Sequence, residues 1–126
     1  MPGTKTNGWS KPGTIHAYFS AAMTAALYGT EWVATFPGRI SAVAVNARTA
    51  GTGGGNTVME LFKNGTTMYT TAANRPTLLA TSTGAFVNTN PDIRSFVPGD
   101  VIALQCSTVS TTGHAAVGYT VLVEAQ

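Results

Sequence analysis

A two-residue turn signal at Asn64-Gly65 is the strongest constraint on how this chain folds. Two β-rich runs, residues 56–63 and 66–71, lie on either side of it. A type I′ turn needs a positive φ at both central residues, and Asn and Gly tolerate that conformation best. The sequence therefore predicts a β-hairpin here, with the remaining strands packed around it.

Other strands are indicated by short runs of alternating apolar and polar residues between turn signals. Pro37-Gly38 and Pro98-Gly99 mark two sharp turns, and the second suits type II because Pro presets φ and Gly accepts a positive φ. Residues 21–27 are alanine-rich and compatible with a short helical turn, whereas 49–55 and 81–90 are expected to be loops. Outside the hairpin, the expected strands cover residues 14–20, 31–36, 39–48, 77–80, 91–96, 101–107 and 115–124.

This pattern predicts an all-β fold, an antiparallel β-sandwich of the jelly-roll type with about eight strands. The long apolar run 119–123 is expected to pair centrally with an early strand. An immunoglobulin-like sandwich is the alternative, weakened because the chain has a single cysteine. Residues 1–13, broken by Pro and Gly, are expected to form an extended N-terminal arm ahead of one domain over 14–126.

Charged residues are unusually scarce. They make up 10% of the chain, with a net charge of +2, against about 25% in a typical soluble domain. The seven cations are scattered, so no basic stripe predicts nucleic-acid binding. No apolar run approaches the ~20 residues of a membrane span, and the first residues lack a signal-peptide pattern. So little charge is typical of a subunit that buries much of its surface in an assembly.

Acidic and histidine residues show no spacing that predicts catalysis or metal binding. The five acids include no pair placed like the facing carboxylates of a glycosidase. Asp100 is expected to accept hydrogen bonds from nearby backbone amides, and Glu60 to pair with a lysine or arginine across the sheet. His16 and His114 would need further ligands to hold a metal ion. The sequence therefore predicts no metal site.

Nucleophile and cofactor motifs are also missing. The chain has no Gly-x-Ser-x-Gly elbow, and the glycine-rich run 51–55 lacks the Lys-Ser/Thr ending of a phosphate-binding loop. Cys106 alternates with Ile102 and Leu104, which favours a buried, inert thiol. We therefore expect neither a cofactor nor enzymatic activity.

Aromatic residues permit a different kind of site. If several were exposed on one face they would form a sugar-stacking platform, but aromatic residues of β-sandwiches usually lie in cores and interfaces, and we favour that interpretation. The residues concerned are Tyr18, Trp32, Tyr69, Phe86 and Tyr119.

Four segments carry a resemblance to a known family. They are residues 49–58 (TAGTGGGNTV), 63–66 (KNGT), 74–77 (NRPT) and 98–102 (PGDVI). In this order they resemble a small jelly-roll domain of tailed-bacteriophage virion proteins, found in head decoration proteins, head fibres and tail-associated fibres. The resemblance covers about residues 38–124. It implies a non-enzymatic structural role in the virion, usually as a trimer.

The single domain, without a stalk or collagen-like repeat, favours the phage head over a fibre tip. The expected function is a capsid decoration (cement) subunit on the capsid surface of the virion. Its expected partners are further copies of itself in a homotrimer and the major capsid protein, which the arm would contact. The candidate partner contacts are Lys5, Trp9, Lys11, Tyr69 and Phe86.

Two other functions remain open at this point. One is a receptor- or glycan-binding module of a phage fibre or tail, which would bind a host surface glycan through loops 51–55, 81–90 and 108–113. The other is a bacterial cell-surface or secreted adhesin, against which the missing signal-peptide pattern counts.

Overall fold

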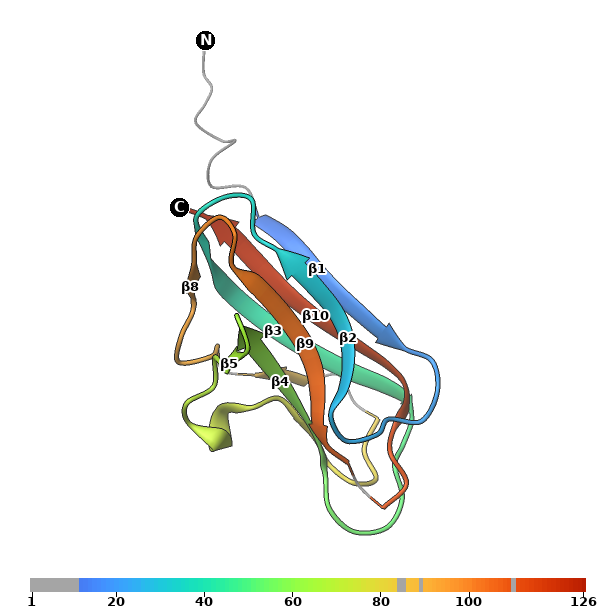
Figure 1. Cartoon of the computed structure of the whole chain (residues 1–126). Helices are drawn as coiled ribbons and strands as arrows, with labels where there is room; N and C mark the ends of the chain where they lie inside the picture. The colour runs from blue at the N-terminus through green and yellow to red at the C-terminus, as the bar shows by residue number, and fades with distance from the viewer. Residues whose placement is uncertain (1–11, 84–85, 89, 110) are drawn as a thin grey trace.

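The computed structural model describes residues 12–83, 86–88, 90–109 and 111–126, which form two antiparallel β-sheets packed face to face (Figure 1). The strands are β1 (Pro12–Phe19), β2 (Leu27–Val33), β3 (Gly38–Thr49), β4 (Thr57–Lys63), β5 (Thr66–Thr67), β6 (Thr77–Leu78), β7 (Phe86–Asn88), β8 (Ser95–Phe96), β9 (Val101–Thr108) and β10 (Ala115–Ala125). A single turn of 3₁₀ helix, η2 (Ala72–Asn74), lies between β5 and β6. The predicted all-β antiparallel sandwich is confirmed.

Each of the two sheets contains five strands. The β10 sheet has the order β1-β10-β3-β7, with β8 also paired to β3. The β9 sheet has the order β2-β9-β4-β5, with β6 also paired to β4. Because β10 lies between β1 and β3, the closing strand pairs centrally with early strands, as predicted.

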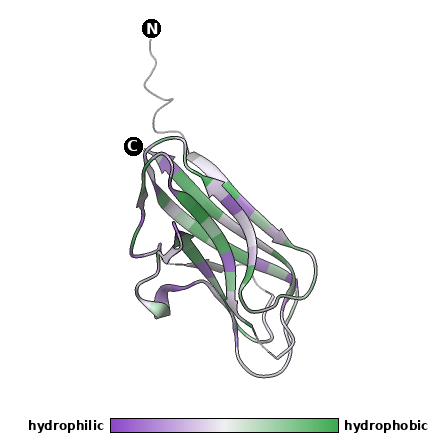
Figure 2. Cartoon of the chain, viewed as in Figure 1, coloured by the Kyte–Doolittle hydropathy of each residue, from purple (hydrophilic) through white to green (hydrophobic). Residues whose placement is uncertain are grey.

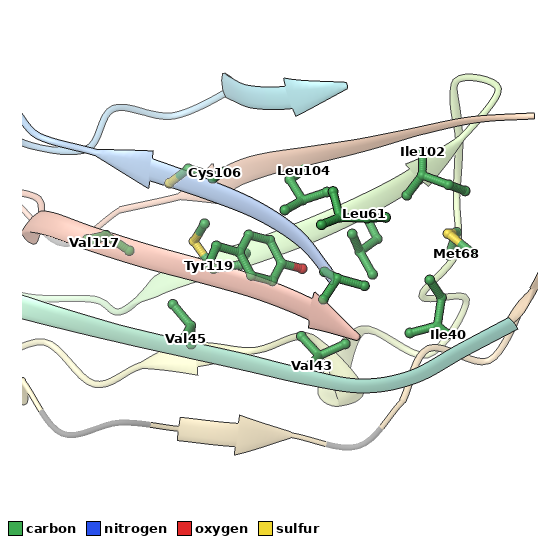
Figure 3. Packing of buried hydrophobic residues seen from close by; sticks show 14 of the residues in the cluster. Ile40, Val43, Val45, Leu61, Met68, Ile102, Leu104, Cys106, Val117 and Tyr119 are labelled. Carbon is green, nitrogen blue, oxygen red and sulfur yellow. The ribbon is translucent and has the colours of Figure 1, made fainter. Parts of the chain in front are cut away.

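The core lies between the sheets and is filled by alternate residues of the facing strands (Figure 3). Leu104 from β9 and Tyr119 from β10 are both fully buried. Burying one such side chain stabilises the fold by about 1.5–3 kcal/mol. Figure 2 shows that the hydrophobic residues are concentrated on the strands. Cys106 belongs to this core, and burial raises the pKa of its thiol to about 11, in agreement with the inert thiol expected from the sequence.

A β-bulge adjusts the longest strand pair to this core. The register between β10 and β3 shifts between Leu122 and Val123, which leaves Ser41 as an extra residue on β3. The Ser41 hydroxyl donates to the Leu122 carbonyl at 3.2 Å. As a result Ile40 and Val43, which strict alternation would place on opposite faces, are both fully buried.

The hairpin forms as predicted. Asn64 and Gly65 have φ values of 53° and 82°, and Lys63 pairs with Thr66 across the turn. The second turn is also confirmed, since Gly99 has a φ of 96° and the Asp100 amide donates to the Val97 carbonyl at 3.1 Å. Both turns are set by local conformational preferences.

Several strand boundaries differ from the expectation. Strand β5 ends at Thr67 because the Thr67 hydroxyl accepts the Tyr69 amide at 3.1 Å, which turns the chain away from β4. Only the end of segment 91–96 pairs, as β8, while the expected loop 81–90 contains β7. Residues 21–26 form no helix, and the Met23 amide instead donates to the His114 carbonyl at 2.8 Å. The first strand starts at Pro12, inside the expected arm.

Gly38 offers a test of how closely the two edges of β3 are packed. A Cβ at this position would collide with the Glu124 carbonyl and lie 2.7 Å from the ring of Phe96. We expect Gly38→Ala to lower the free energy of unfolding by about 1–3 kcal/mol, measured by urea denaturation. The control is Gly54→Ala, where a Cβ meets nothing within 4 Å and the change should stay within about 1 kcal/mol of zero. Equal effects of the two changes would contradict this account.

Candidate interaction surface

Of the residues that the sequence proposed as partner contacts, the structure describes the side chain of Tyr69. Lys5, Trp9 and Lys11 lie outside the described residues, as does the side chain of Phe86. Tyr69 is fully buried, so the expectation of an exposed contact is wrong for this residue within the folded chain. Burial, with Glu60 nearby, raises the pKa of its hydroxyl well above the ordinary value.

The sugar-stacking platform considered above does not form among the aromatic side chains that the structure describes. Tyr119 is fully buried between the sheets. Trp32 packs edge-on against Phe96, with ring centroids 5.2 Å apart. Tyr18 is 57% exposed, but it lies on β1, in the opposite sheet from Trp32. For the aromatic side chains that the structure describes, the interpretation as core residues holds for Tyr69 and Tyr119.

The outer face of the β9 sheet carries an exposed apolar surface instead. Tyr28 and Phe62 lie on strands to either side of β9, with ring centroids 6.2 Å apart. Between them lies Ala103, which is 8% exposed although it faces away from the core. Ala103 pairs with Phe62 on β4 and with Glu31 on β2, and Tyr28, which pairs with Gln105, is 51% exposed.

Two valines extend this surface along the same face. Val33 pairs with Val101 one outward-facing position beyond the Glu31–Ala103 pair, and Val33 is 55% exposed. We call Tyr28, Val33, Phe62 and Val101 the aromatic–valine patch. Clusters of exposed aromatic and aliphatic side chains are characteristic of protein–protein contact surfaces.

The sequence did not reveal this patch because β2 is irregular. The register between β2 and β9 shifts between Tyr28 and Glu31. The two-residue alternation of inward and outward side chains along β2 is therefore interrupted just after Tyr28. Tyr28 therefore lay outside the expected strand 31–36. Phe62 was the one part of the patch that the sequence hinted at, because it alternates with the apolar residues of the hairpin strand and so shares the mixed apolar and polar face of that strand with Glu60.

A buried carboxylate borders the patch on β4. Strands β5 and β6 pair with the two ends of β4 and leave its middle without a continuous neighbour. Glu60 fills this gap, since its Oε1 accepts the Leu61 amide at 3.0 Å and the Thr67 hydroxyl at 2.9 Å. The side chain thus satisfies a backbone donor that an adjacent strand would otherwise bind.

Arg75 balances the charge of this carboxylate. Its Nε lies 2.8 Å from Oε2 of Glu60, whose side chain is only 3% exposed. Arg75 Nε makes no aligned hydrogen bond, so the contact is electrostatic. The sequence correctly expected a cation for Glu60, but the partner comes from the segment after η2 and not from a neighbouring strand.

The Glu60–Arg75 contact should matter more than an ion pair at the surface. Arg75→Ala leaves a buried carboxylate without its counter-charge, and we expect it to lower the free energy of unfolding by about 1–3 kcal/mol. The control is Arg39→Ala, which removes a pair with Glu124 whose side chains are 48% and 37% exposed and should cost less than about 1 kcal/mol. Denaturation in urea measures both, and a larger loss for Arg39→Ala would refute the assignment.

Asp92 holds the segment that carries Arg75. Its carboxylate accepts the Thr71 amide at 2.8 Å, the Thr71 hydroxyl at 3.3 Å and the Asn74 side-chain amide at 3.2 Å. The hydrogen bond from the Thr71 backbone is the main reason why the pKa of Asp92 lies below its ordinary value. Asp92 therefore fastens both ends of η2 to the segment that leads into β8.

This lowered pKa predicts how stability depends on pH. A carboxyl group whose pKa is lower in the folded state stabilises the fold fully above its unfolded pKa of about 3.9. That contribution is lost as the pH falls through the lower folded value. As the pH is lowered from about 6 to about 3, the free energy of unfolding should therefore fall less for Asp92→Asn than for the unmodified protein. Urea denaturation at each pH measures both. Parallel stability curves would contradict the prediction.

His114 is the clearest functional-looking residue that turns out to be structural. It is fully buried; its Nδ1 lies 2.8 Å from the Thr57 hydroxyl, and its Nε2 lies 3.0 Å from the Leu79 carbonyl and 2.9 Å from that of Ser82. With Nε2 as donor and Nδ1 as acceptor, the neutral ring satisfies both nitrogens. His114 thus anchors segment 79–82 to the end of the sandwich, a role that the sequence did not indicate.

The loops of the glycan-binding alternative are partly engaged with each other. Thr52 and Thr112 form a two-way bridge, with N–O distances of 2.9 Å and 3.0 Å. The Gly54 amide also donates to the Thr111 hydroxyl at 3.2 Å. These contacts join loops 51–55 and 108–113 at one end of the molecule, below β4 and β9 in the view of Figure 1.

Metal-binding groups do not cluster in the part of the chain that the structure describes. No three His, Cys, Asp or Glu side chains there are placed to hold one ion. His16 lies with its Nδ1 3.0 Å from the Thr120 hydroxyl, on the β10 sheet.

Over the same described residues, no helix has the length and hydropathy of a membrane span.

Comparisons with protein-family models, curated proteins and solved structures find no significant match. The resemblance to the virion family therefore rests on the four sequence segments.

Proposed function

We propose that this protein is a non-enzymatic structural subunit of a bacteriophage virion, a capsid decoration protein that assembles as a homotrimer on the head surface. The resemblance of its turn segments suggests this class. The strand order supports the jelly-roll part of the proposal, because successive long strands alternate between the sheets. Strands β1, β3 and β10 belong to one sheet, and β2, β4 and β9 belong to the other.

The aromatic–valine patch is the observation that carries the proposal. A chain with 10% charged residues that exposes Tyr28 and Val33 on one sheet face gains stability when a second protein surface covers them. Burial of apolar area contributes about 25 cal/mol per Å². The aromatic residues of the patch, Tyr28 and Phe62, are of the types that are enriched at the centre of protein interfaces.

The environment of the buried polar groups supports a structural role. Glu60 is held by Leu61, Thr67 and Arg75, and His114 is held by Thr57 and the 79–82 segment. Both side chains are almost fully buried, at 2% and 0% exposure. The hydrogen bonds of each side chain therefore connect segments of the sandwich to one another.

Two matched tyrosine variants test the proposal. Tyr28 and Tyr18 are 51% and 57% exposed on edge strands of opposite sheets. We expect Tyr28→Ser to weaken both self-association and saturable binding to undecorated capsids of the parent phage by at least about tenfold. Tyr18→Ser should leave both unchanged. Sedimentation measures the assembly, co-sedimentation measures capsid binding, and urea denaturation verifies that both variants remain folded.

The outcomes separate the proposed function from its rivals. Absence of saturable capsid binding by the unmodified protein would refute the decoration role. Specific binding on a glycan array, without capsid binding, would instead support a fibre or tail module. Equal effects of the two tyrosine changes on association would show that the aromatic–valine patch is not the contact surface.

A further inference from the structure

The Asn64-Gly65 turn is a chemically reactive dipeptide in an exposed position. Both residues are exposed, and a Cβ at Gly65 would meet nothing within 4 Å. The space on the side of Gly65 where a Cβ would lie is therefore open. An Asn-Gly sequence is intrinsically prone to deamidation, because the missing side chain of Gly leaves that amide nitrogen free to approach the Asn side chain.

The reaction proceeds without an enzyme and needs only water. The Gly65 backbone nitrogen, after losing its proton to solvent, attacks Cγ of Asn64. A C–N bond forms and the Cγ–Nδ2 bond breaks, so that Nδ2 leaves as ammonia and a cyclic succinimide remains. Water then opens the ring at one of its two carbonyl groups, which yields aspartate or isoaspartate. No oxidation or reduction takes place.

In the folded protein, contacts with the 97–101 segment hold the side-chain amide of Asn64 at both ends. Its Nδ2 donates to Oδ1 of Asp100 at 2.8 Å, and its Oδ1 accepts the Val101 amide at 2.9 Å. The backbone amide of Asn64 also donates to the Val101 carbonyl at 2.9 Å. For Cγ of Asn64 to approach the Gly65 nitrogen, the side chain would have to break its hydrogen bonds to Asp100 and to the Val101 amide.

We propose that Asn64 is a deamidation site that the fold protects, and that Asp100 is the residue that holds it in the unreactive position. Asp100 is itself fixed, since its Oδ2 accepts the Val97 amide at 2.9 Å. That bond, followed by the one from Asn64, also keeps the pKa of Asp100 below its ordinary value. Asp100 therefore presents a charged acceptor, and charge-assisted hydrogen bonds are stronger than neutral ones.

Deamidation would reverse the sign of this contact. The product carries a carboxylate where Nδ2 now donates, so two negative groups would face each other at hydrogen-bond distance. Lys63, whose charge acts on Asp100, would offset only part of the repulsion. Isoaspartate would in addition lengthen the backbone of a turn whose two-residue length sets the hairpin register. The reaction would thus loosen the junction between β4 and β9, next to Val101 of the aromatic–valine patch.

The rate of deamidation in three samples tests the protection. The samples are the folded protein, the urea-denatured protein and folded Asp100→Ala, all kept at mildly alkaline pH and analysed by peptide mass spectrometry. We expect Asn64 to react at least about tenfold more slowly in the folded protein than in the other two, a factor equivalent to about 1.4 kcal/mol. The second Asn-Gly pair of the chain, Asn7-Gly8, is the reference in each digest, and Asp100→Ala should not change its rate in the folded chain.

The same rate at Asn64 in folded and denatured protein would overturn the proposal. An unchanged rate in folded Asp100→Ala would overturn the role of Asp100. If Asp100→Ala does not fold, Asp100→Asn takes its place. It has one side-chain oxygen in place of the two that bind Asn64 and Val97 separately, and that oxygen carries no charge. Asn64 should therefore still react several times faster than in the unmodified protein, and an unchanged rate would count against the proposal.

A second measurement examines the predicted repulsion. Asn64→Asp imitates the aspartate product and should lower the urea midpoint of unfolding at neutral pH. The same change in an Asp100→Ala or Asp100→Asn background should lower the midpoint less, because the opposing carboxylate is absent. An equal shift in both backgrounds would contradict the like-charge explanation.

Discussion

The contact between the Asn64 side chain and the 97–101 segment determines how the β9 sheet is aligned. The hairpin sets where β4 ends, and the turn at Pro98-Gly99 sets where β9 begins. The Asn64 amide joins the two through Asp100 and Val101. With both ends aligned, Leu61 pairs with Leu104, and both side chains point into the core. A shift of one residue in this pairing would turn the apolar side chains of β4 outward.

Polar side chains complete the sandwich where its strands are interrupted. Glu60 satisfies the Leu61 amide between β5 and β6, Asp92 satisfies the Thr71 amide before η2, and His114 binds two carbonyl groups of the 79–82 segment. In each case a side chain supplies a hydrogen-bond partner that a regular strand would have supplied. Such residues resemble catalytic candidates in the sequence, since acids and histidines are common to both roles. Their contacts distinguish the two.

The outer face of the β9 sheet carries the aromatic–valine patch together with the outward-facing Glu31, and the exposed Tyr18 lies on the opposite sheet. The patch around Ala103 combines two aromatic rings with two valines. The outward residues of β3, by contrast, include Ala44 and Asn46, which are small or polar. A subunit that covers one face in an assembly and leaves the other to solvent would show such a difference. The low charge of the chain is consistent with this arrangement.

The sequence by itself determined the features that depend on neighbouring residues. The hairpin at Asn64-Gly65, the Pro98-Gly99 turn, the backbone bonding of Asp100 and the buried thiol of Cys106 follow from local conformational preference or strict alternation. Only the tertiary structure decided the short strands β7 and β8, the partner of Glu60, the role of His114 and the position of Tyr28. The first three depend on groups brought together across long sequence separations. Tyr28 depends on an irregularity in β2 that interrupts the two-residue period, and a pattern based on that period could not detect it.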